Sequence, residues 1–141
     1  MRPLVFILFM GVLGLNLNAQ EKKADISFKT DVIDYGEIEH GGDGTREFKF
    51  TNTGDAMLVI TKVYSTCGCT IPKKPKNPIK PGDSGVIEVK YNTELAPGPI
   101  RKTITVYTNA SKEPYTLKIK GTLLPKKGAL EKSKNGPTNS N

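Results

Sequence analysis

Residues 85–91 read GVIEVKY, and the apolar residues Ile87, Val89 and Tyr91 alternate there with charged ones. A period of two is typical of a β-strand that buries one face and exposes the other. The same alternation recurs in three further stretches, residues 48–51, 100–106 and 115–120. Helical spacing of apolar residues is absent from the segment 25–124. We therefore predict an all-β domain.

Turn-forming residues separate these stretches at the intervals expected of a β-sandwich. The turns fall at residues 41–44, 52–55, 81–83, 96–99 and 109–111. The strands between them are expected at residues 25–29, 32–38, 45–52, 57–65, 85–92, 100–108 and 114–124. About seven strands in about 100 residues fit an immunoglobulin-like β-sandwich, and a small open barrel is the alternative. Because residues 57–63 are apolar on both faces, we expect them to form a central strand.

The first nineteen residues have the layout of a secretory signal peptide. A positive start precedes an apolar run over residues 4–15, and Ala19 is a small residue before the expected cleavage point. The apolar run is shorter than the roughly 20 residues that span a bilayer. We predict a cleaved signal peptide (1–19), export to the periplasm or the extracellular space, and no stable membrane span. A membrane anchor is the alternative.

The rest of the chain divides into one domain over residues 20–124 and a tail over residues 125–141. The tail is rich in Lys, Asn, Ser and Gly, and we expect it to be a disordered basic and polar segment. The formal net charge is +7 for the whole chain, but the lysines are scattered along the predicted strands. This distribution is typical of solvated faces, so we predict no nucleic-acid partner.

Cys67 and Cys69 are the only cysteines, and Gly68 alone separates them. In the chain-entropy treatment, a bridge that closes so small a loop adds only roughly 1.6 kcal/mol of stability. The sequence admits four interpretations: buried packing, a local disulfide, a soft-metal site for copper or zinc, and pairing with another chain. Gly68 would let the two cysteines lie close together.

Residues 71–82 interrupt the strand pattern with four prolines, which donate no backbone hydrogen bond. We expect this passage to run along a sheet edge at one end of the sandwich, where binding residues commonly lie. The candidate binding loop consists of Thr70, Lys73, Lys74, Lys76 and Lys80. Further turn-forming residues are Asn52 and Gly54, which tolerate positive φ, and Pro81 and Gly82, which suit a type II turn.

The stretches FKFTNTG (48–54), LVI (58–60), STCGCT (65–70) and PIKPG (78–82) together resemble the bacterial family called "domain of unknown function 1573". Matches also occur at residues 34–36, 108–109 and 121, and the resemblance covers about residues 28–123. It implies an immunoglobulin-like domain, similar to spindle/Hydin-type domains, that acts as a non-catalytic binding module in exported proteins of Bacteroidetes-type bacteria. One departure is Lys74-Pro75-Lys76, since such sequences often carry a Trp there.

Ordinary enzyme chemistry finds no support in the sequence. His40 is the only histidine, whereas a hydrolase needs a histidine base beside its nucleophile. The neighbouring glycine-rich stretch 41–44 lacks the lysine of a phosphate-binding loop, and we expect a hairpin turn there. We predict an exported binding or assembly module with a protein partner, no enzymatic activity and no cofactor. The alternative is a thiol redox or soft-metal protein that uses Cys67 and Cys69. No motif specifies the partner or the oligomeric state.

Overall fold

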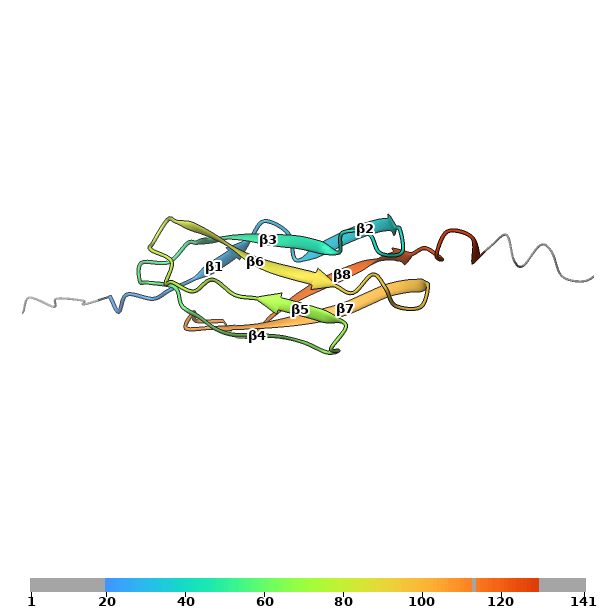
Figure 1. Cartoon of the computed structure of the whole chain (residues 1–141). Helices are drawn as coiled ribbons and strands as arrows, with labels where there is room; N and C mark the ends of the chain where they lie inside the picture. Colours follow the sequence, from blue (N-terminus) through green and yellow to red (C-terminus); the bar gives the residue numbers. More distant parts are fainter. Residues whose placement is uncertain (1–19, 113, 130–141) are drawn as a thin grey trace, which may run out of the picture.

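The alternating stretches form strands in the structure, a computed structural model that describes residues 20–112 and 114–129. Strands β1 to β8 form two four-stranded sheets that pack face to face in an elongated sandwich (Figure 1). The prediction of an all-β, immunoglobulin-like sandwich is confirmed. The predicted signal peptide and most of the predicted tail lie outside the described residues. No helix within the described ranges is long and apolar enough to cross a membrane.

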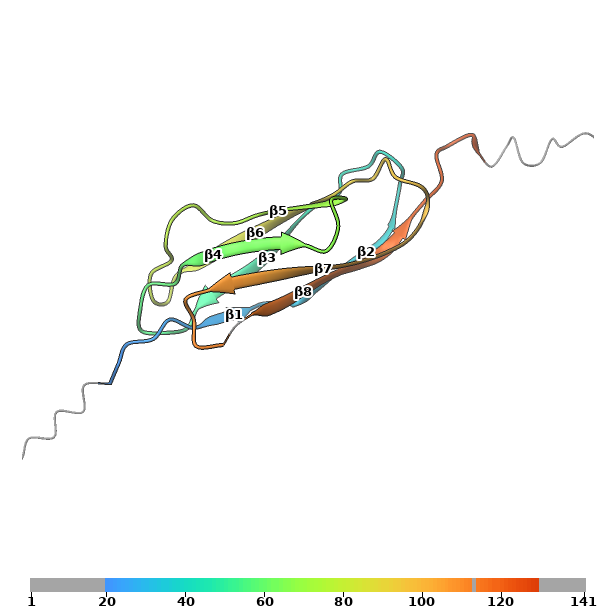
Figure 2. The same cartoon turned by 90° about the horizontal axis from the view of Figure 1, so that it is seen from below.

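In both sheets, most hydrogen-bonded neighbours are not consecutive in the chain. The first sheet runs β1 (Ile26–Phe28), β3 (Thr45–Asn52), β6 (Ser84–Tyr91), β5 (Thr70–Lys73), with every pair antiparallel. The second sheet runs β2 (Val32–Ile38), β8 (Tyr115–Leu123), β7 (Gly98–Thr108), β4 (Ile60–Ser65). Only the β2–β8 pair is parallel. Strands β4 and β5, the last of each sheet, lie side by side at one edge of the sandwich (Figure 2).

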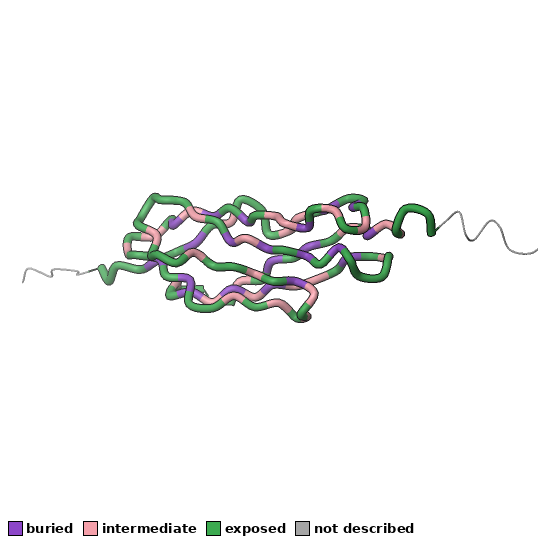
Figure 3. Tube along the Cα trace, in the orientation of Figure 1, coloured by how far each residue is buried: buried purple, intermediate pink, exposed green. Residues whose placement is uncertain are grey.

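The core lies between the sheets and consists of the apolar face of each alternating strand. Phe48, Ile87, Ile104 and Leu117 have no exposed surface, and the residues beside them in each strand are partly or fully exposed. Buried and exposed positions alternate along the strands in Figure 3. Burying a side chain of this size contributes roughly 1.5–3 kcal/mol. The alternation in the sequence thus accounts for the four inner strands, β3, β6, β7 and β8.

The expectation of a central strand over residues 57–63 is wrong. Strand β4 begins at Ile60 and lies at the edge of its sheet. Leu58 and Ile60 face the core, whereas Met57 and Val59 are 44% and 37% exposed. The continuous apolar run reflects one buried face and one exposed apolar face, since β7 and β8 already occupy the centre of the sheet.

An eighth strand, β5, lies in the proline-rich passage, which we expected to run along a sheet edge without adding a strand. Asn92 N–H donates to Cys69 O at 2.8 Å, so by alternation Ile71 directs its backbone groups toward β6 and Pro72 directs its own away. A proline is tolerated in an edge strand when its missing N–H faces outward. The prolines therefore permit one edge strand here.

The glycine-rich stretch 41–44 is not a hairpin turn, because β2 and β3 belong to different sheets. It is a crossover, and buried groups anchor it: Tyr35 Oη donates to Gly44 O at 2.6 Å, and Tyr91 N–H donates to the same oxygen at 3.0 Å. Burial raises the pKa of Tyr35 to about 12, although the nearby Arg46 guanidinium opposes the shift. A Cβ on Gly44 would collide with the Tyr91 carbonyl oxygen.

Candidate functional site

The chain passes from one sheet to the other through the turn that contains the cysteines. Cys67 and Cys69 are joined by a disulfide, with Cα atoms 5.4 Å apart. Thr66 N–H donates to Thr103 O of β7 at 3.2 Å, and Cys69 O accepts from Asn92, just after β6, at 2.8 Å. The disulfide ring therefore bridges a crossover whose two sides are tied to opposite sheets.

The geometry around the cysteines favours a local bridge over the other interpretations. Both cysteines are half-buried, and Cys69 N–H lies 3.2 Å from Cys67 Sγ. Within the described residues, three or more His, Cys, Asp or Glu side chains do not gather anywhere in a metal-binding cluster. Gly68 is exposed, its φ is not positive, and a Cβ there would meet open space. Steric need does not explain Gly68, contrary to our expectation.

Residues 58–65 and 70–79 run beside one another in opposite directions and are pinned at both ends. At the far end from the disulfide, Leu58 and Ile79 exchange backbone hydrogen bonds of 2.9 and 2.8 Å. Between these pins β4 pairs only with β7, and β5 pairs only with β6. We call this seam, where the two sheet edges lie side by side without pairing, the β4–β5 opening.

The β4 backbone is unpaired on the side that faces the opening. The hydrogen bond from Thr66 N–H to Thr103 O fixes the alternation, so Val63 and Ser65 direct their N–H and C=O groups away from β7. On the opposite strand, Pro72 directs its backbone outward but has no N–H to offer. Strand β4 is therefore the edge that can accept a further strand.

Exposed apolar side chains lie on the segments that border the opening. Met57, Val59, Tyr64 and Ile71 are four of the six large hydrophobic residues that are exposed in the described structure, and Ile71 is 65% exposed. The Tyr64 ring lies parallel to the Tyr107 ring, with centroids 6.3 Å apart. Lys62 Nζ lies 5.2 Å from the centroid of the Tyr64 ring. The edge thus combines unpaired backbone with apolar and cationic side chains.

The candidate binding loop is only partly exposed. Its lysines, Lys73, Lys74, Lys76 and Lys80, are all exposed along the passage that borders the opening. Thr70 is 3% exposed, and its hydroxyl lies 3.8 Å from Cys69 Sγ. The inclusion of Thr70 in a binding surface is therefore wrong, since its side chain points into the sandwich.

Asn52 acts through its side chain rather than through a turn conformation. It is fully buried, and Nδ2 donates to Ala56 O at 2.8 Å and to Ile79 O at 2.9 Å. Gly54 N–H donates to Oδ1 at 3.0 Å. This side chain satisfies the backbone around the pin between Leu58 and Ile79.

The reason we expected for Gly54 is also wrong. Its φ is not positive, and a Cβ there would collide with the backbone of residues 23–25. Pro81 and Gly82 do form the expected type II turn: Gly82 has a φ of 80°, and Asp83 N–H donates to Lys80 O at 3.0 Å.

Asn109 lies in a predicted turn, but its role was not predicted: it holds the start of β4 against the end of β7. Its Nδ2 donates to Met57 O at 2.9 Å, and Val59 N–H donates to Oδ1 at 2.8 Å. The sequence indicated only a turn and a family match at this position. Its partners lie about fifty positions away in the chain, so local patterns give no access to them.

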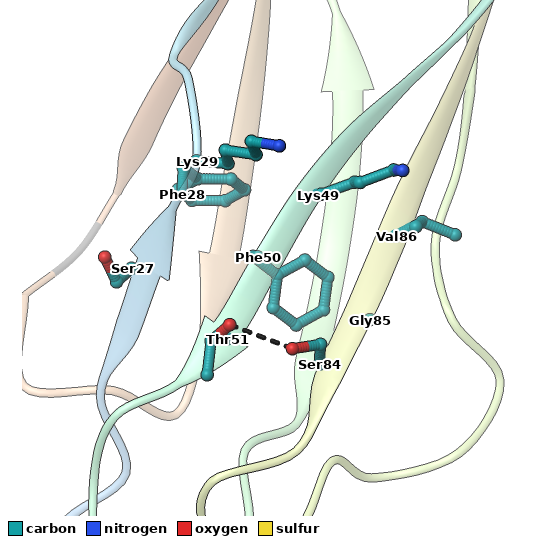
Figure 4. A pocket seen from close by; sticks show the side chains of 9 residues that line it. All are labelled: Ser27, Phe28, Lys29, Lys49, Phe50, Thr51, Ser84, Gly85 and Val86. Atoms are coloured by element: carbon teal, nitrogen blue, oxygen red, sulfur yellow. Dashed lines mark hydrogen bonds between the residues drawn. The ribbon is translucent and has the colours of Figure 1, made fainter.

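Several hollows in the described structure lie outside the opening, and some of them border the first sheet. A groove of about 610 Å³ beside the disulfide is lined by both the glycine-rich crossover and residues 90–94. A second hollow, of about 420 Å³, lies on the first sheet (Figure 4). Phe28, Phe50 and Val86 line it, and a hydrogen bond of 2.9 Å joins Thr51 Oγ1 and Ser84 Oγ at one side.

Solved structures with a similar fold come from several kinds of protein. A protein of unknown function from Porphyromonas gingivalis W83 gives a TM-score of 0.61 at 18% identity, over 77% of this chain and 51% of that one. The PapD-like domain 7 of human CEP192 gives 0.54 at 12% identity, over 82% and 96%. The CsuC–CsuE chaperone–tip adhesion subunit pre-assembly complex of Acinetobacter baumannii gives 0.52 at 14% identity, over 74% and 58%.

These likenesses show the fold, and the chain spans about half the length of the P. gingivalis protein. No curated protein matches the sequence. A family model described as "Protein of unknown function (DUF1573)" matches residues 26–123, which span every strand of both sheets. The chain belongs to the DUF1573 family.

Proposed function

We propose that this protein is an exported, non-catalytic module that binds an extended segment of a partner protein along β4. The observation that carries the proposal is the direction of the backbone at Val63 and Ser65, whose N–H and C=O groups face the β4–β5 opening. Export is supported by the signal-peptide layout of residues 1–19.

A free sheet edge binds extended peptides because their main chain completes the ladder of hydrogen bonds. The pins at both ends of the opening hold β4 in place before a partner arrives. A preformed edge loses little conformational entropy on binding, which favours affinity.

Similar folds lend further support. One solved structure of this fold is the CsuC–CsuE chaperone–tip adhesion subunit pre-assembly complex, which is a complex between two proteins. The described part of this chain offers a sheet edge of its own, together with the exposed Tyr64 and Ile71 beside it.

Photocrosslinking in the native host tests the proposal. A photoreactive phenylalanine derivative in place of Tyr64 lies beside the free edge, and the same group in place of Lys118, which is exposed on β8, serves as the control. We expect a protein adduct of discrete mass from position 64 and none from position 118. No adduct, or the same adducts from both positions, would contradict docking along β4.

A further inference from the structure

Charge is distributed unevenly between the two edges of the sandwich. Residues 56–82, which contain β4, β5 and both pins, carry five lysines and no Asp or Glu. Residues 30–45, which contain β2 at the other edge of the second sheet, carry five acidic residues and no Lys or Arg. The segment that contains β4 and β5 therefore carries only positive charge of its own, and Glu88 of β6 lies opposite Lys73 in the strand register.

We infer that the segment bound by β4 is an acidic peptide strand in which acidic and apolar residues alternate. The inference rests on the proposed function and adds the chemistry of the partner. Successive side chains of a paired strand point to opposite faces of the sheet. Acidic residues on the outer face would lie near Lys62, and apolar residues on the inner face would lie beside Val63, which packs against the core.

The position of the lysines matches this arrangement. Lys62 projects from the outer face of β4 beside the Tyr64 ring, and the exposed Lys73, Lys74 and Lys76 follow along the other border of the opening. An acidic strand along the unpaired side of β4 would lie close to Lys62 and to the lysines that follow β5, of which Lys73 has Glu88 as its β6 partner. Such complementarity raises association rates and excludes basic segments.

A nucleic acid fits this edge less well than a peptide. Val63 and Ser65 each present one backbone donor and one backbone acceptor to a partner. Tyr64 and Ile71 offer apolar contacts, and both features suit a polypeptide strand. A second copy of the chain is also a poorer occupant. The acidic β2 edge already has Asp34 3.7 Å from Lys120 and Glu39 3.3 Å from Lys127.

Binding of defined peptides tests the inference. The probe is a labelled peptide of about eight residues that alternates glutamate and valine, and its twin alternates lysine and valine. Fluorescence anisotropy measures affinity, and the amide resonances of the isotope-labelled protein locate the site. We expect the acidic peptide to bind at least about tenfold more tightly than the basic twin and to weaken as salt rises. The largest resonance shifts should fall at Val63 and Ser65.

Charge reversals separate this edge from the rest of the surface. Lys62→Glu and Lys73→Glu should each weaken the acidic peptide by up to about fivefold, whereas Lys118→Glu on β8 should change its affinity by less than about twofold. Ser65→Pro removes an outward backbone donor without removing a hydrogen bond to β7. It should abolish the shift of the Val63 amide resonance that the acidic peptide causes. The unfolding temperature of each variant shows whether it is folded.

Several outcomes would overturn the inference. Equal binding of both peptides would contradict the preference for acidic segments. A photocrosslinked adduct from position 64 would still support docking along β4. Tighter binding of a single-stranded oligothymidylate would identify the edge as a polyanion surface. Salt-sensitive self-association of the protein alone, lost in Asp34→Lys, would make a second copy the occupant. Absence of peptide binding at β4 would reject an acidic strand, and the photocrosslinking experiment would then decide on docking itself.

Discussion

Leu58 and Ile79 each donate a backbone N–H to the carbonyl oxygen of the other, at 2.9 and 2.8 Å, although twenty-one positions separate them in the chain. This isolated bridge closes one end of the β4–β5 opening, and the crossover with the Cys67–Cys69 disulfide closes the other. The unpaired edge of β4 is therefore held at both ends by contacts within the domain. The free energy of unfolding of the domain depends on the side chains that hold these and neighbouring loops in place.

Asn52→Ala should lower the free energy of unfolding by about 2–4 kcal/mol, because it leaves buried backbone groups near Ile79 without partners. Urea denaturation measures the change. Asn109→Ala is the matched control, since its side chain makes two similar bonds but is exposed, and it should cost about 1 kcal/mol. Equal costs for the two variants would show that burial at position 52 has no special weight.

Gly54→Ala and Gly68→Ala should differ sharply. A Cβ at position 54 collides with the backbone of residues 23–25, so we expect a loss of about 2 kcal/mol or more. A Cβ at position 68 meets open space at a φ that is not positive, so its effect should stay within about 0.5 kcal/mol. Thermal unfolding of both variants provides the comparison, and a destabilised Gly68→Ala protein would refute the geometry of the turn.

Replacing the cysteines should reveal a bridge rather than two packed thiols. Cys67→Ser, Cys69→Ser and the double variant should each lose roughly 1.6 kcal/mol, because removing either sulfur opens the same small ring. Denaturant titration gives these values, and alkylation of the unreduced, unfolded wild-type protein should add no mass. Additive losses in the double variant, or two alkylated thiols, would instead indicate independent packing.

Tyr35 should make stability depend on pH in the alkaline range. Its pKa is raised by burial to about 12, whereas an unfolded tyrosine titrates near 10. Between these values the folded protein keeps a proton that the unfolded chain releases, so stability falls as pH rises. The contribution is fully present below pH 10 and amounts to at most about 3 kcal/mol.

Tyr35→Phe is the control for that titration, since lysines also lose charge at alkaline pH. We expect the wild type to be more stable than the variant below pH 10, because Tyr35 Oη donates to Gly44 O at 2.6 Å. Denaturant titrations at several pH values should show this advantage shrinking toward pH 12. A constant difference between the two proteins would mean that Tyr35 does not titrate in this range.

Alternation with a period of two was sufficient to predict the inner strands, because a strand with one buried face must repeat every second residue. Residues 85–91 and 115–120 lie in β6 and β8 as expected. The same reasoning failed for residues 57–63. An apolar residue has the same appearance in a sequence whether it faces the core, as Leu58 does, or solvent, as Met57 does.

The candidate site was predicted in part for a similar reason. The prolines and lysines of residues 71–82 indicated an exposed edge, and the lysines are exposed there. The inward direction of Thr70 and the two long-range bonds of Asn109 depend on strand register and on partners far away in the chain. Tyr64 gave no signal at all, since an aromatic residue in a strand is usually buried.

The sequence by itself determined the all-β class, the inner strands, the type II turn at Pro81-Gly82 and the family, because these depend on local conformation and on short motifs. Only the tertiary structure decided that β4 and β5 end different sheets, that Val63 and Ser65 face an opening, and that its ends are pinned. Those features follow from pairing between distant segments. The free energy of that pairing comes from the core that both sheets share, and no local stretch contains it.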